Sequence, residues 1–192
     1  MKLIFATNND HKVQEIRNVV RRDFEIVTLK EAGILIDIPE PHATLEENAS
    51  EKSWTIYNMT GSPCFSEDTG LEVEALNGEP GVKSARYAGP GRSFDANIEK
   101  LLQNLADEKN RKARFRTVIS LIIDGKETMF EGVCEGLIAT ERKGIQGFGY
   151  DPVFIPSGSE LHFGEMSLPE KNVFSHRKKA TEKLVAFLNN MT

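Results

Sequence analysis

The stretch that decides the fold reads FRTVISLII at residues 115–123, DG at residues 124–125 and KETMFEGVCEGLIA at residues 126–139. The first run is rich in β-branched and large apolar residues, which favour strands. Asp-Gly between two such runs is the strongest short signal for a two-residue hairpin turn. The sequence therefore predicts two antiparallel strands that form either an arm or the centre of an antiparallel sheet.

The start of the chain has a different pattern, typical of a strand followed by a helix. A β-rich run at residues 2–6 precedes a polar loop at residues 7–10, and Val13 and Ile16 then recur at helical spacing. Such a junction presents free backbone N–H groups and the positive end of a helix dipole, and Lys12 adds a positive charge. The loop is therefore either a site for an anion or an ordinary helix cap.

Two further helices are predicted in the middle of the chain. Thr44 and Glu47 form a capping box for a helix that Gly61 ends. Ser93 can cap a second helix, whose apolar stripe spans residues 98–105. Helices mixed with strands, a βα unit at the start and a later hairpin together predict an α/β (mixed α+β) fold built on a mixed twisted sheet.

Composition sets limits on the class of protein. The chain has 192 residues, of which 39% are hydrophobic and 28% charged, as is usual for a globular protein. The net charge of −5 argues against binding to nucleic acid or to an anionic membrane surface. The sequence contains neither a long apolar run nor a signal peptide, so we expect a cytoplasmic protein with no membrane partner. Cys64 and Cys134 are expected to be free buried thiols.

Two adjacent acids, Glu67 and Asp68, stand in the stretch FSEDTG at residues 65–70. We expect one strand to end at Phe65 and another to begin at residue 71, with Gly70 in the turn between them. A carboxylate at a strand end is held firmly and is suited to a divalent metal or an attacking water. The alternative is that the two acids only solvate a tight turn.

Two other charged residues have unusual surroundings. Glu40 lies between two prolines, which favour an extended, stiff loop. Lys52 falls near the inward-facing stripe of its helix, where a lysine needs a partner such as a phosphate or a carboxylate, unless it extends along the helix to solvent.

The last third of the chain offers aromatic residues and cations. Phe148 and Tyr150 stand in a glycine-flanked loop, where they either stack on a planar ring or fold into the core. Residues 177–179 place three cations at the start of the last helix, against its dipole, so a bound anion or an electron-rich acceptor would explain them, as would solvent.

Six short motifs occur in a fixed order along the chain. They are TNNDHK at 7–12, ENA at 47–49, SEDTGL at 66–71, PGVKSAR at 80–86, FGYDP at 148–152 and SHR at 175–177. In order and spacing they resemble the signature of the inosine/xanthosine triphosphate pyrophosphatase family, over nearly the whole chain.

This resemblance implies a function and an architecture. Members of that family hydrolyse non-standard purine nucleoside triphosphates (ITP, dITP and XTP) to the monophosphate and pyrophosphate, and so cleanse the nucleotide pool. They need Mg²⁺ and are usually homodimers. The resemblance also implies a single domain over residues 1–192, with an elongated sheet and two lobes around a central cleft.

The resemblance further assigns roles to residues. Asp68 is the candidate catalytic base, and Glu40 and Asp68 would hold the metal, with Glu67 as a further candidate ligand. The implied substrate-binding residues are Thr7, Asn8, Asn9, Asp10, His11, Lys12, Lys52, Thr69, Phe148, Gly149, Tyr150, Asp151, Lys171, His176 and Arg177. Among these, Phe148 would stack on the purine, and Arg177 is our choice for the donor to its 6-oxo oxygen.

Two positions depart from the family pattern. Asn9 stands where a glycine is common, and asparagine tolerates the left-handed conformation better than most residues. Glu67 stands where many relatives have aspartate. The alternative functions are a pyrophosphatase for pyrimidine or modified nucleotides, as in septum-inhibition proteins of related fold, and a non-catalytic nucleotide-binding protein.

Overall fold

The computed structural model describes residues 1–20 and 24–191. The helices are α1 (Asp10–Val19), α2 (Leu45–Thr60), α3 (Phe94–Asn104), α4 (Leu168–Phe174) and α5 (His176–Asn189). The strands are β1 (Lys2–Phe5), β2 (Glu25–Thr28), β3 (Cys64–Val73), β4 (Pro80–Gly81), β5 (Lys112–Ile123), β6 (Lys126–Ile138) and β7 (Phe154–Pro156).

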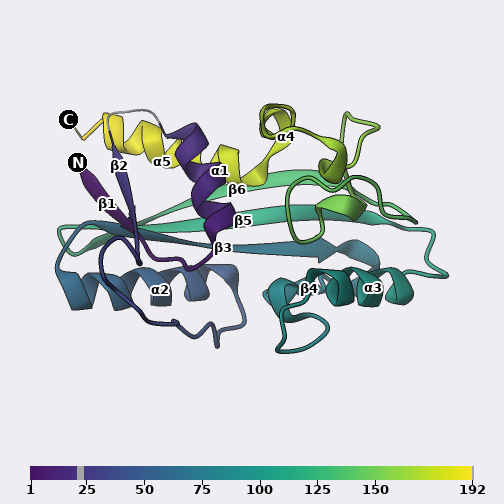
Figure 1. The fold of residues 1–192 in the computed structure, drawn as a ribbon, viewed down its shortest axis with the longest axis horizontal. Coiled ribbons are helices and arrows are strands. Elements are labelled where there is room, and N and C mark those ends of the chain that lie inside the picture. Colours follow the sequence, from purple (N-terminus) through teal and green to yellow (C-terminus); the bar gives the residue numbers. More distant parts are fainter. Residues whose placement is uncertain (21–23, 192) are drawn as a thin grey trace. The chain divides into compact units, whose positions relative to one another are not determined.

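The strands form a mixed sheet in the order β2-β1-β3-β5-β6-β7, with β4 paired to β3 (Figure 1). Strand β1 is parallel to both β2 and β3, whereas β7 runs antiparallel to β6. The sheet and its helices confirm the predicted mixed α/β class. Within the described ranges, no helix has the length and apolar character needed to cross a membrane.

Local signals placed most of these elements correctly. Asp124 and Gly125 have φ values of 50° and 69°, which are the positive angles that a two-residue hairpin turn between β5 and β6 requires. The side chain of Thr44 accepts the amide of Glu47 at the start of α2, and Gly61 ends that helix with φ 62°. Ser93 caps α3 as predicted.

Helix α4 was not predicted from the sequence. Ser167 and Glu170 form a capping box there, in which the carboxylate of Glu170 accepts both the amide and the hydroxyl of Ser167. This serine-glutamate spacing is the same signal that predicted α2. The sequence therefore contained a local signal for the start of α4.

The predicted break at Phe65 to Gly70 is wrong, because β3 runs through it without interruption. Gly70 is not among the glycines with positive φ. A Cβ at Gly70 would lie 2.7 Å from the backbone oxygen of Gly81, so the glycine permits the close approach of β4. Glu67 and Asp68 are therefore held by a strand and not by a turn.

The chain divides into two compact units, and β3, β5 and β6 contribute residues to both. The first unit comprises Met1–Asp68, Thr117–Gly132 and Arg177–Thr192. The second comprises Thr69–Arg116 and Val133–His176. Each unit has its own hydrophobic core.

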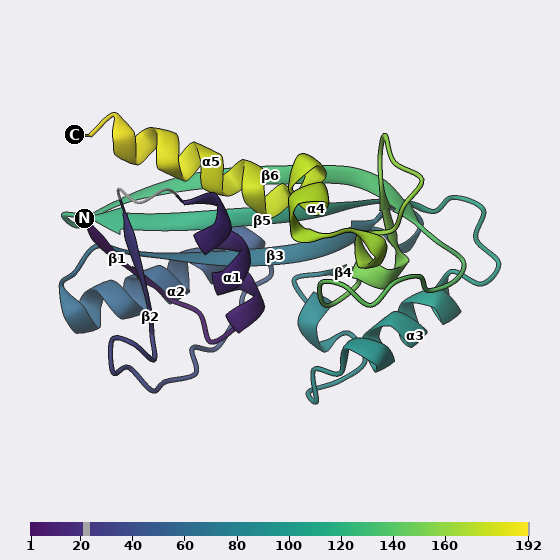
Figure 2. The same cartoon turned by 45° about the horizontal axis from the view of Figure 1, so that its top comes forward.

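In the first unit, helices cover both faces of the sheet (Figures 1 and 2). Ile119, Leu121 and Ile123 of β5 belong to the core that α1 and α5 cover, whereas Ile122 belongs to the core that α2 covers. This alternation follows from the two-residue period of a strand. It explains why residues 121–123 are apolar without interruption, since both faces of the strand are buried there.

In the second unit, Ile98 and Leu101 of α3 and Leu105, the residue that caps its end, belong to a core that also contains Phe115 and Phe154. The predicted stripe of α3 is confirmed at these three leucine and isoleucine positions, and Leu102 is packed against the same core while partly exposed. Tyr150 also lies in this core and is 4% exposed.

Candidate functional site

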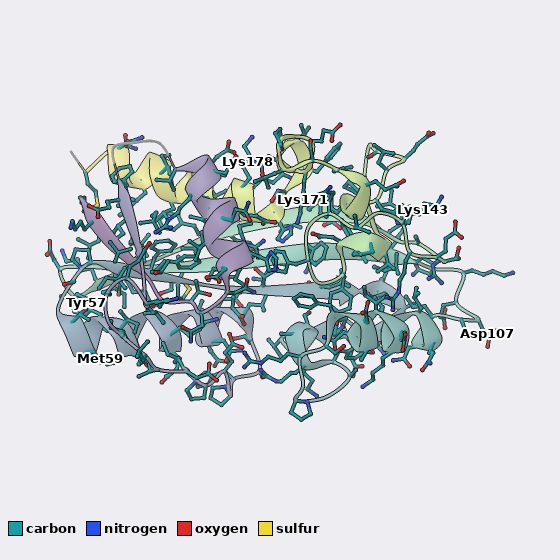
Figure 3. The ribbon with its side chains drawn as sticks, in the orientation of Figure 1. Tyr57, Met59, Asp107, Lys143, Lys171 and Lys178 are labelled. Atoms are coloured by element: carbon teal, nitrogen blue, oxygen red, sulfur yellow. The ribbon has the colours of Figure 1, made fainter. Side chains whose placement is uncertain are left out.

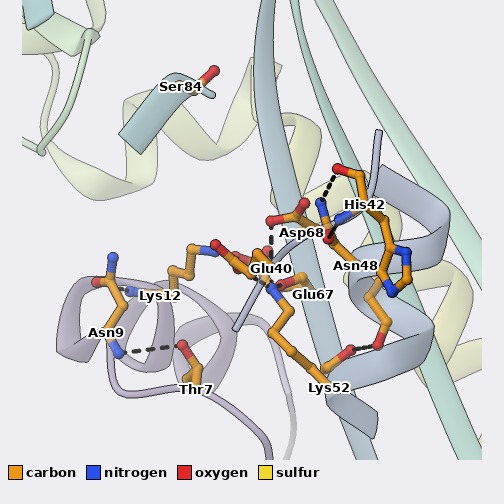
Figure 4. A network of polar contacts seen from close by, with 12 residues as sticks. Thr7, Asn9, Lys12, Glu40, His42, Asn48, Lys52, Glu67, Asp68 and Ser84 are labelled. Atoms are coloured by element: carbon orange, nitrogen blue, oxygen red, sulfur yellow. Dashed lines mark hydrogen bonds and ion pairs between the residues drawn. The ribbon is translucent and has the colours of Figure 1, made fainter. Parts of the chain in front are cut away.

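The centre of the candidate site in the first unit is an ion-pair cluster around Lys52 (Figure 4). The Lys52 ammonium donates to Glu40 Oε1 at 2.5 Å, to the backbone oxygen of Glu67 at 2.8 Å and to Asp68 Oδ1 at 3.3 Å. The partner that the sequence required for Lys52 is therefore a pair of carboxylates. Helix α2, the loop that carries Glu40 and strand β3 meet at this ammonium.

Helix α2 is fixed against β3 and β5 by buried hydroxyl groups. Ser66 donates to the backbone oxygen of Ala49 at 2.5 Å, and the Oγ atoms of Ser53 and Ser120 lie 2.5 Å apart. Buried polar groups that are hydrogen-bonded in this way fix the relative placement of the elements they join. Lys52 therefore projects from a helix whose position is set by its neighbours.

Burial changes the proton affinities in this cluster. Burial raises the pKa of Asp68 above its ordinary value, and this effect outweighs the attraction of Lys52 and Lys12. The pKa of Lys52 is also raised, because the carboxylates of Asp68 and Glu40 outweigh a burial that alone would lower it. Lys52 thus stays a cation at neutral pH.

Asp68 has an oxygen that suits a further ligand. Its Oδ2 atom is buried and receives no hydrogen bond from residues 1–20 or 24–191. Over the same residues, no group of three or more His, Cys, Asp or Glu side chains is placed to hold a metal ion. Mg²⁺ is commonly bound through only one or two carboxylates together with substrate phosphates. The pair Glu40 and Asp68 fits that donor set.

Glu67 points into a second ion-pair cluster within the same unit. Its Oε1 lies 2.9 Å from the Lys12 ammonium, and its two oxygens accept Nη2 and Nε of Arg177 at 3.1 and 2.8 Å. Burial alone would raise the pKa of Glu67, but Arg177 and Lys12 hold it well below its ordinary value. Glu67 therefore fixes these two cations, and its role as a further metal ligand stays a prediction.

Arg177 is 2% exposed and pairs with two acids. Besides Glu67 it donates through Nη1 to Glu15 of α1. These carboxylates account for the cation at the start of α5, which the sequence interpretation explained by an anion or an electron-rich acceptor. Its assignment as the donor to a purine oxygen stays a prediction.

Glu15 was not predicted as a site residue, although its inward position on α1 is a signal in the sequence. It stands beside Ile16 on the inward side of α1 and is 7% exposed. An acid that helical periodicity places inward needs a cation as partner, by the same reasoning that was applied to Lys52.

The N-terminal loop forms as predicted but without a left-handed residue. Asn9 has φ −98° and accepts the amides of His11 and Lys12 through its side chain. Its role is that of a helix cap, so the expected tolerance of asparagine for left-handed backbone is not used. Asn8 donates to the backbone oxygen of Ile36 at 2.8 Å, while Asp10 and His11 are exposed at the start of α1.

A second group of predicted residues lies in the second unit, around Lys171 of α4 (Figure 3). The Lys171 ammonium pairs with Asp151 at 2.6 Å and lies 5.4 Å from the ring centre of Phe148. Asp151 also accepts the amide of Phe148 at 2.9 Å. The half-buried ring of Phe148 is thus held beside a buried ion pair.

Tyr150 and His176 are buried in this unit instead of being presented on a loop. The hydroxyl of Tyr150 donates to the backbone oxygen of Ser84 at 2.8 Å. The ring of His176, 2% exposed, stacks on Phe115 with ring centres 4.6 Å apart. Of the two alternatives that the sequence left open for these aromatics, folding into the core applies to Tyr150, whereas stacking of Phe148 on a planar ring stays a prediction. Thr69, the first residue of this unit, is half-buried in β3.

Asn97 of α3 was also overlooked, although it organises the PGVKSAR segment. Its side chain donates to the backbone oxygens of Ser84 and Ala85 and accepts the amide of Ala88 at 2.7 Å. It stands beside Ile98 on the buried stripe, where an asparagine needs several partners.

Gly147 should be hard to replace. It has φ +73°, and a Cβ there would lie 1.9 Å from Asp151 Oδ2, whereas Gly149 has φ +62° and open space around it. We expect Gly147→Ala to cost at least about 1.5 kcal/mol more unfolding free energy than Gly149→Ala, because it also displaces Asp151 from its buried hydrogen bonds. Urea unfolding of both variants measures the difference. Equal losses would contradict the assigned contact.

Comparisons with known proteins identify the family of this chain. The model of the Ham1 family matches residues 3–187. The dITP/XTP pyrophosphatase of Porphyromonas gingivalis is 54% identical over 97% of both chains, and that of Christiangramia forsetii is 47% identical over 98% of this chain and all of the relative.

Solved structures give the same result. The Ham1 protein of Staphylococcus aureus is 37% identical with a TM-score of 0.91 over the whole of both chains. A nucleoside-triphosphatase / dITP/XTP pyrophosphatase of Mycobacterium abscessus, also 37% identical, has a TM-score of 0.78 over 96% of this chain and 99% of its own. With the family model spanning nearly every residue and relatives matched end to end, the chain belongs to the Ham1 family.

Proposed function

We propose that this chain hydrolyses dITP, ITP and XTP to the corresponding monophosphate and pyrophosphate, in a reaction that depends on Mg²⁺. The observation that carries the proposal is the buried cluster of Asp68, Glu40 and Lys52 in a chain whose full-length relatives are named dITP/XTP pyrophosphatases. We further propose that the protein acts in the cytoplasm as a homodimer.

The proposed reaction is the attack of water on the α-phosphorus. The new bond joins the water oxygen to that phosphorus, the bond to the oxygen that bridges the α- and β-phosphoryl groups breaks, and pyrophosphate leaves with the bonding electron pair. Asp68 accepts the proton of the attacking water. A carboxylate held rigidly by a strand, with one oxygen not used within the described part of the chain, suits this role.

The residues of the first unit would hold the polyphosphate. The amides at the start of α1 and the ammonium of Lys12 offer donors and positive charge to an anion, and Lys52 offers a second ammonium. Glu40 and Asp68 would hold Mg²⁺, and the buried Oδ2 of Asp68 supports that fit. Neutralisation of charge on the phosphate oxygens is the chemistry that Mg²⁺ supplies when bound.

The residues of the second unit would hold the base. Phe148 offers a half-buried aromatic face whose position is fixed by Asp151 and Lys171. Contacts of Gly149, Tyr150 and Asp151 with base or sugar would then involve the backbone, since the side chains of Tyr150 and Asp151 are used within the unit.

The decisive experiment is pyrophosphate release with Mg²⁺ over a panel of triphosphates: those of inosine, xanthosine, guanosine, adenosine and the pyrimidines. We expect kcat/KM for dITP to exceed that for dATP by about tenfold or more, because donors aimed at a 6-oxo oxygen are left unpaired against a 6-amino group. Equal rates across the panel would contradict the specificity. Absence of release from every triphosphate would favour a non-catalytic binding protein, and a preference for pyrimidines would favour the other alternative.

A further inference from the structure

The ammonium of Lys52 occupies the same pair of carboxylates that the proposed function assigns to the metal. It is 2.5 Å from Glu40 Oε1 and 3.3 Å from Asp68 Oδ1, and its third acceptor is the backbone oxygen of Glu67 at 2.8 Å. An ammonium has three donors, so this arrangement satisfies all of them. Lys52 is thus a cation of this carboxylate pair.

A metal ion held by both acids would compete with this ammonium. Asp68 keeps a second oxygen, Oδ2, that accepts nothing from the described part of the chain, but Glu40 is engaged through Oε1 with Lys52. A divalent ion close to both acids would repel the ammonium strongly, because like charges at such distances interact by several kcal/mol even in a partly polar environment. Coordination by both acids therefore requires Lys52 to release Glu40.

The lysine can move without its helix. The hydroxyl of Ser53, the next residue, donates to the backbone oxygens of Ala49 and Ser50 and lies 2.5 Å from the Oγ atom of Ser120. These contacts fix the backbone at this point of α2. The flexible part is the four-carbon stem of Lys52, which has several rotamers. Rotation of the outer stem is enough to move the ammonium from the carboxylates to another anion.

We propose that Lys52 competes with the divalent metal for Glu40 and Asp68, and that it is released to bind the polyphosphate only when metal has taken its place. Lys52 thereby lowers the metal affinity of the nucleotide-free protein and makes the binding of metal and of nucleotide mutually favourable. The inference rests on the proposed function, since it takes Glu40 and Asp68 as the metal pair.

The expected gain in metal affinity follows from the removal of the positive charge of Lys52. An opposite charge within about 4–6 Å lowers the affinity of a carboxylate for a proton by about 1–3 pH units, and it acts on a metal ion in the same sense. We therefore expect Lys52→Met to bind metal at least about tenfold more tightly than the unmodified protein.

The test is a titration of the nucleotide-free, full-length protein with Mn²⁺, followed by electron paramagnetic resonance of the unbound ion. The matched comparison is Lys12→Met, which removes an ammonium that pairs with Glu67 at 2.9 Å and attracts Asp68 less than Lys52 does. Lys178→Met, whose partly exposed side chain pairs with Glu182, controls for net charge. Lys178→Met should tighten Mn²⁺ binding less than threefold, and Lys12→Met should tighten it less than Lys52→Met does.

An unchanged or weaker Mn²⁺ affinity in Lys52→Met would overturn the proposal, as would an equal gain in Lys12→Met. Lys52→Gln provides a second variant that keeps hydrogen-bond donors without the charge, and it should behave like Lys52→Met. In thermal unfolding, Mg²⁺ should raise the melting temperature of both Lys52 variants more than that of the unmodified protein, because tighter binding to the native state stabilises more. Equal shifts would also count against the competition.

These outcomes are separate from those of the triphosphate panel. If the Lys52 variants bind Mn²⁺ more tightly but the unmodified protein releases no pyrophosphate, the proposed function is refuted and the competition stands. If the unmodified protein releases pyrophosphate from dITP but the Lys52 variants bind Mn²⁺ no more tightly than it does, the function stands and the competition is refuted.

Discussion

Replacing Asp68 with asparagine is expected to lower kcat for dITP by at least about 100-fold while the nucleotide still binds, because a positioned general base contributes about 100- to 10,000-fold. Asparagine has nearly the same shape as aspartate but cannot accept the proton of the attacking water. Asp68 Oδ1 is 3.3 Å from Lys52, so the substitution also removes one charge from the cluster around that ammonium. Pyrophosphate release gives kcat, and calorimetry with a non-hydrolysable dITP analogue gives the affinity.

The matched control lies on the same strand. Glu72 of β3 pairs with Arg114 at 2.7 Å on the exposed part of the second unit, and Glu72→Gln removes a carboxylate by the same chemistry. Its kcat should stay within about twofold of the unmodified value, since an exposed ion pair contributes little. Residual turnover near the unmodified rate in Asp68→Asn would remove Asp68 from the role of base.

Arg177→Met is expected to have the largest effect on stability, a loss of about 3–5 kcal/mol of unfolding free energy. Arg177 is buried and donates through Nε and Nη2 to Glu67 and through Nη1 to Glu15. Without the guanidinium, two buried carboxylates lose the cation that they share. Their negative charge would then have to be compensated by water or protons in the interior. Urea unfolding of the metal-free protein, followed by circular dichroism, measures the loss.

Two variants separate the buried network from the general effect of losing a cation. Lys178→Met removes the next cation on α5, whose side chain is 35% exposed and pairs with Glu182, and should cost no more than about 0.5 kcal/mol. Arg177→Lys keeps the charge but not the bidentate fork to Glu67, so its loss should lie between the other two. A loss in Arg177→Met as small as that in Lys178→Met would show that the buried network contributes little.

Much of the fold could be predicted because its signals are local. The hairpin turn at Asp124 and Gly125, the cap at Thr44 and the stop at Gly61 each depend on a few neighbouring residues, and the structure confirms all three. The strand through Glu67 and Asp68 was misjudged for the opposite reason. Two adjacent acids and a glycine favour a turn locally, but the cations Lys52, Lys12 and Arg177 come from distant parts of the chain.

For the candidate site, the sequence indicated which charged residues take part but not which of them pair with one another. The resemblance to the family pointed to the acidic and basic residues of the site. The inward position of Lys52 indicated that it needed an anionic partner. Which carboxylate takes which cation was not predictable, because each choice depends on how α1, α2, β3 and α5 are placed in the first unit. Arg177, which the resemblance assigns to the base, pairs with Glu67 and Glu15, and Glu15 was not among the residues predicted from the sequence.

The sequence by itself determined the fold class, several of the helices and strands, and the set of residues from which the family could be recognised. These follow from hydrophobic periodicity, capping and motif spacing, all of which act over short distances along the chain. Only the tertiary structure decided that Glu67 fixes cations, that Tyr150 and His176 are buried, and that Lys52 already holds Glu40 and Asp68. The physical reason is that buried charges take their partners from whichever elements the packing of the core brings beside them.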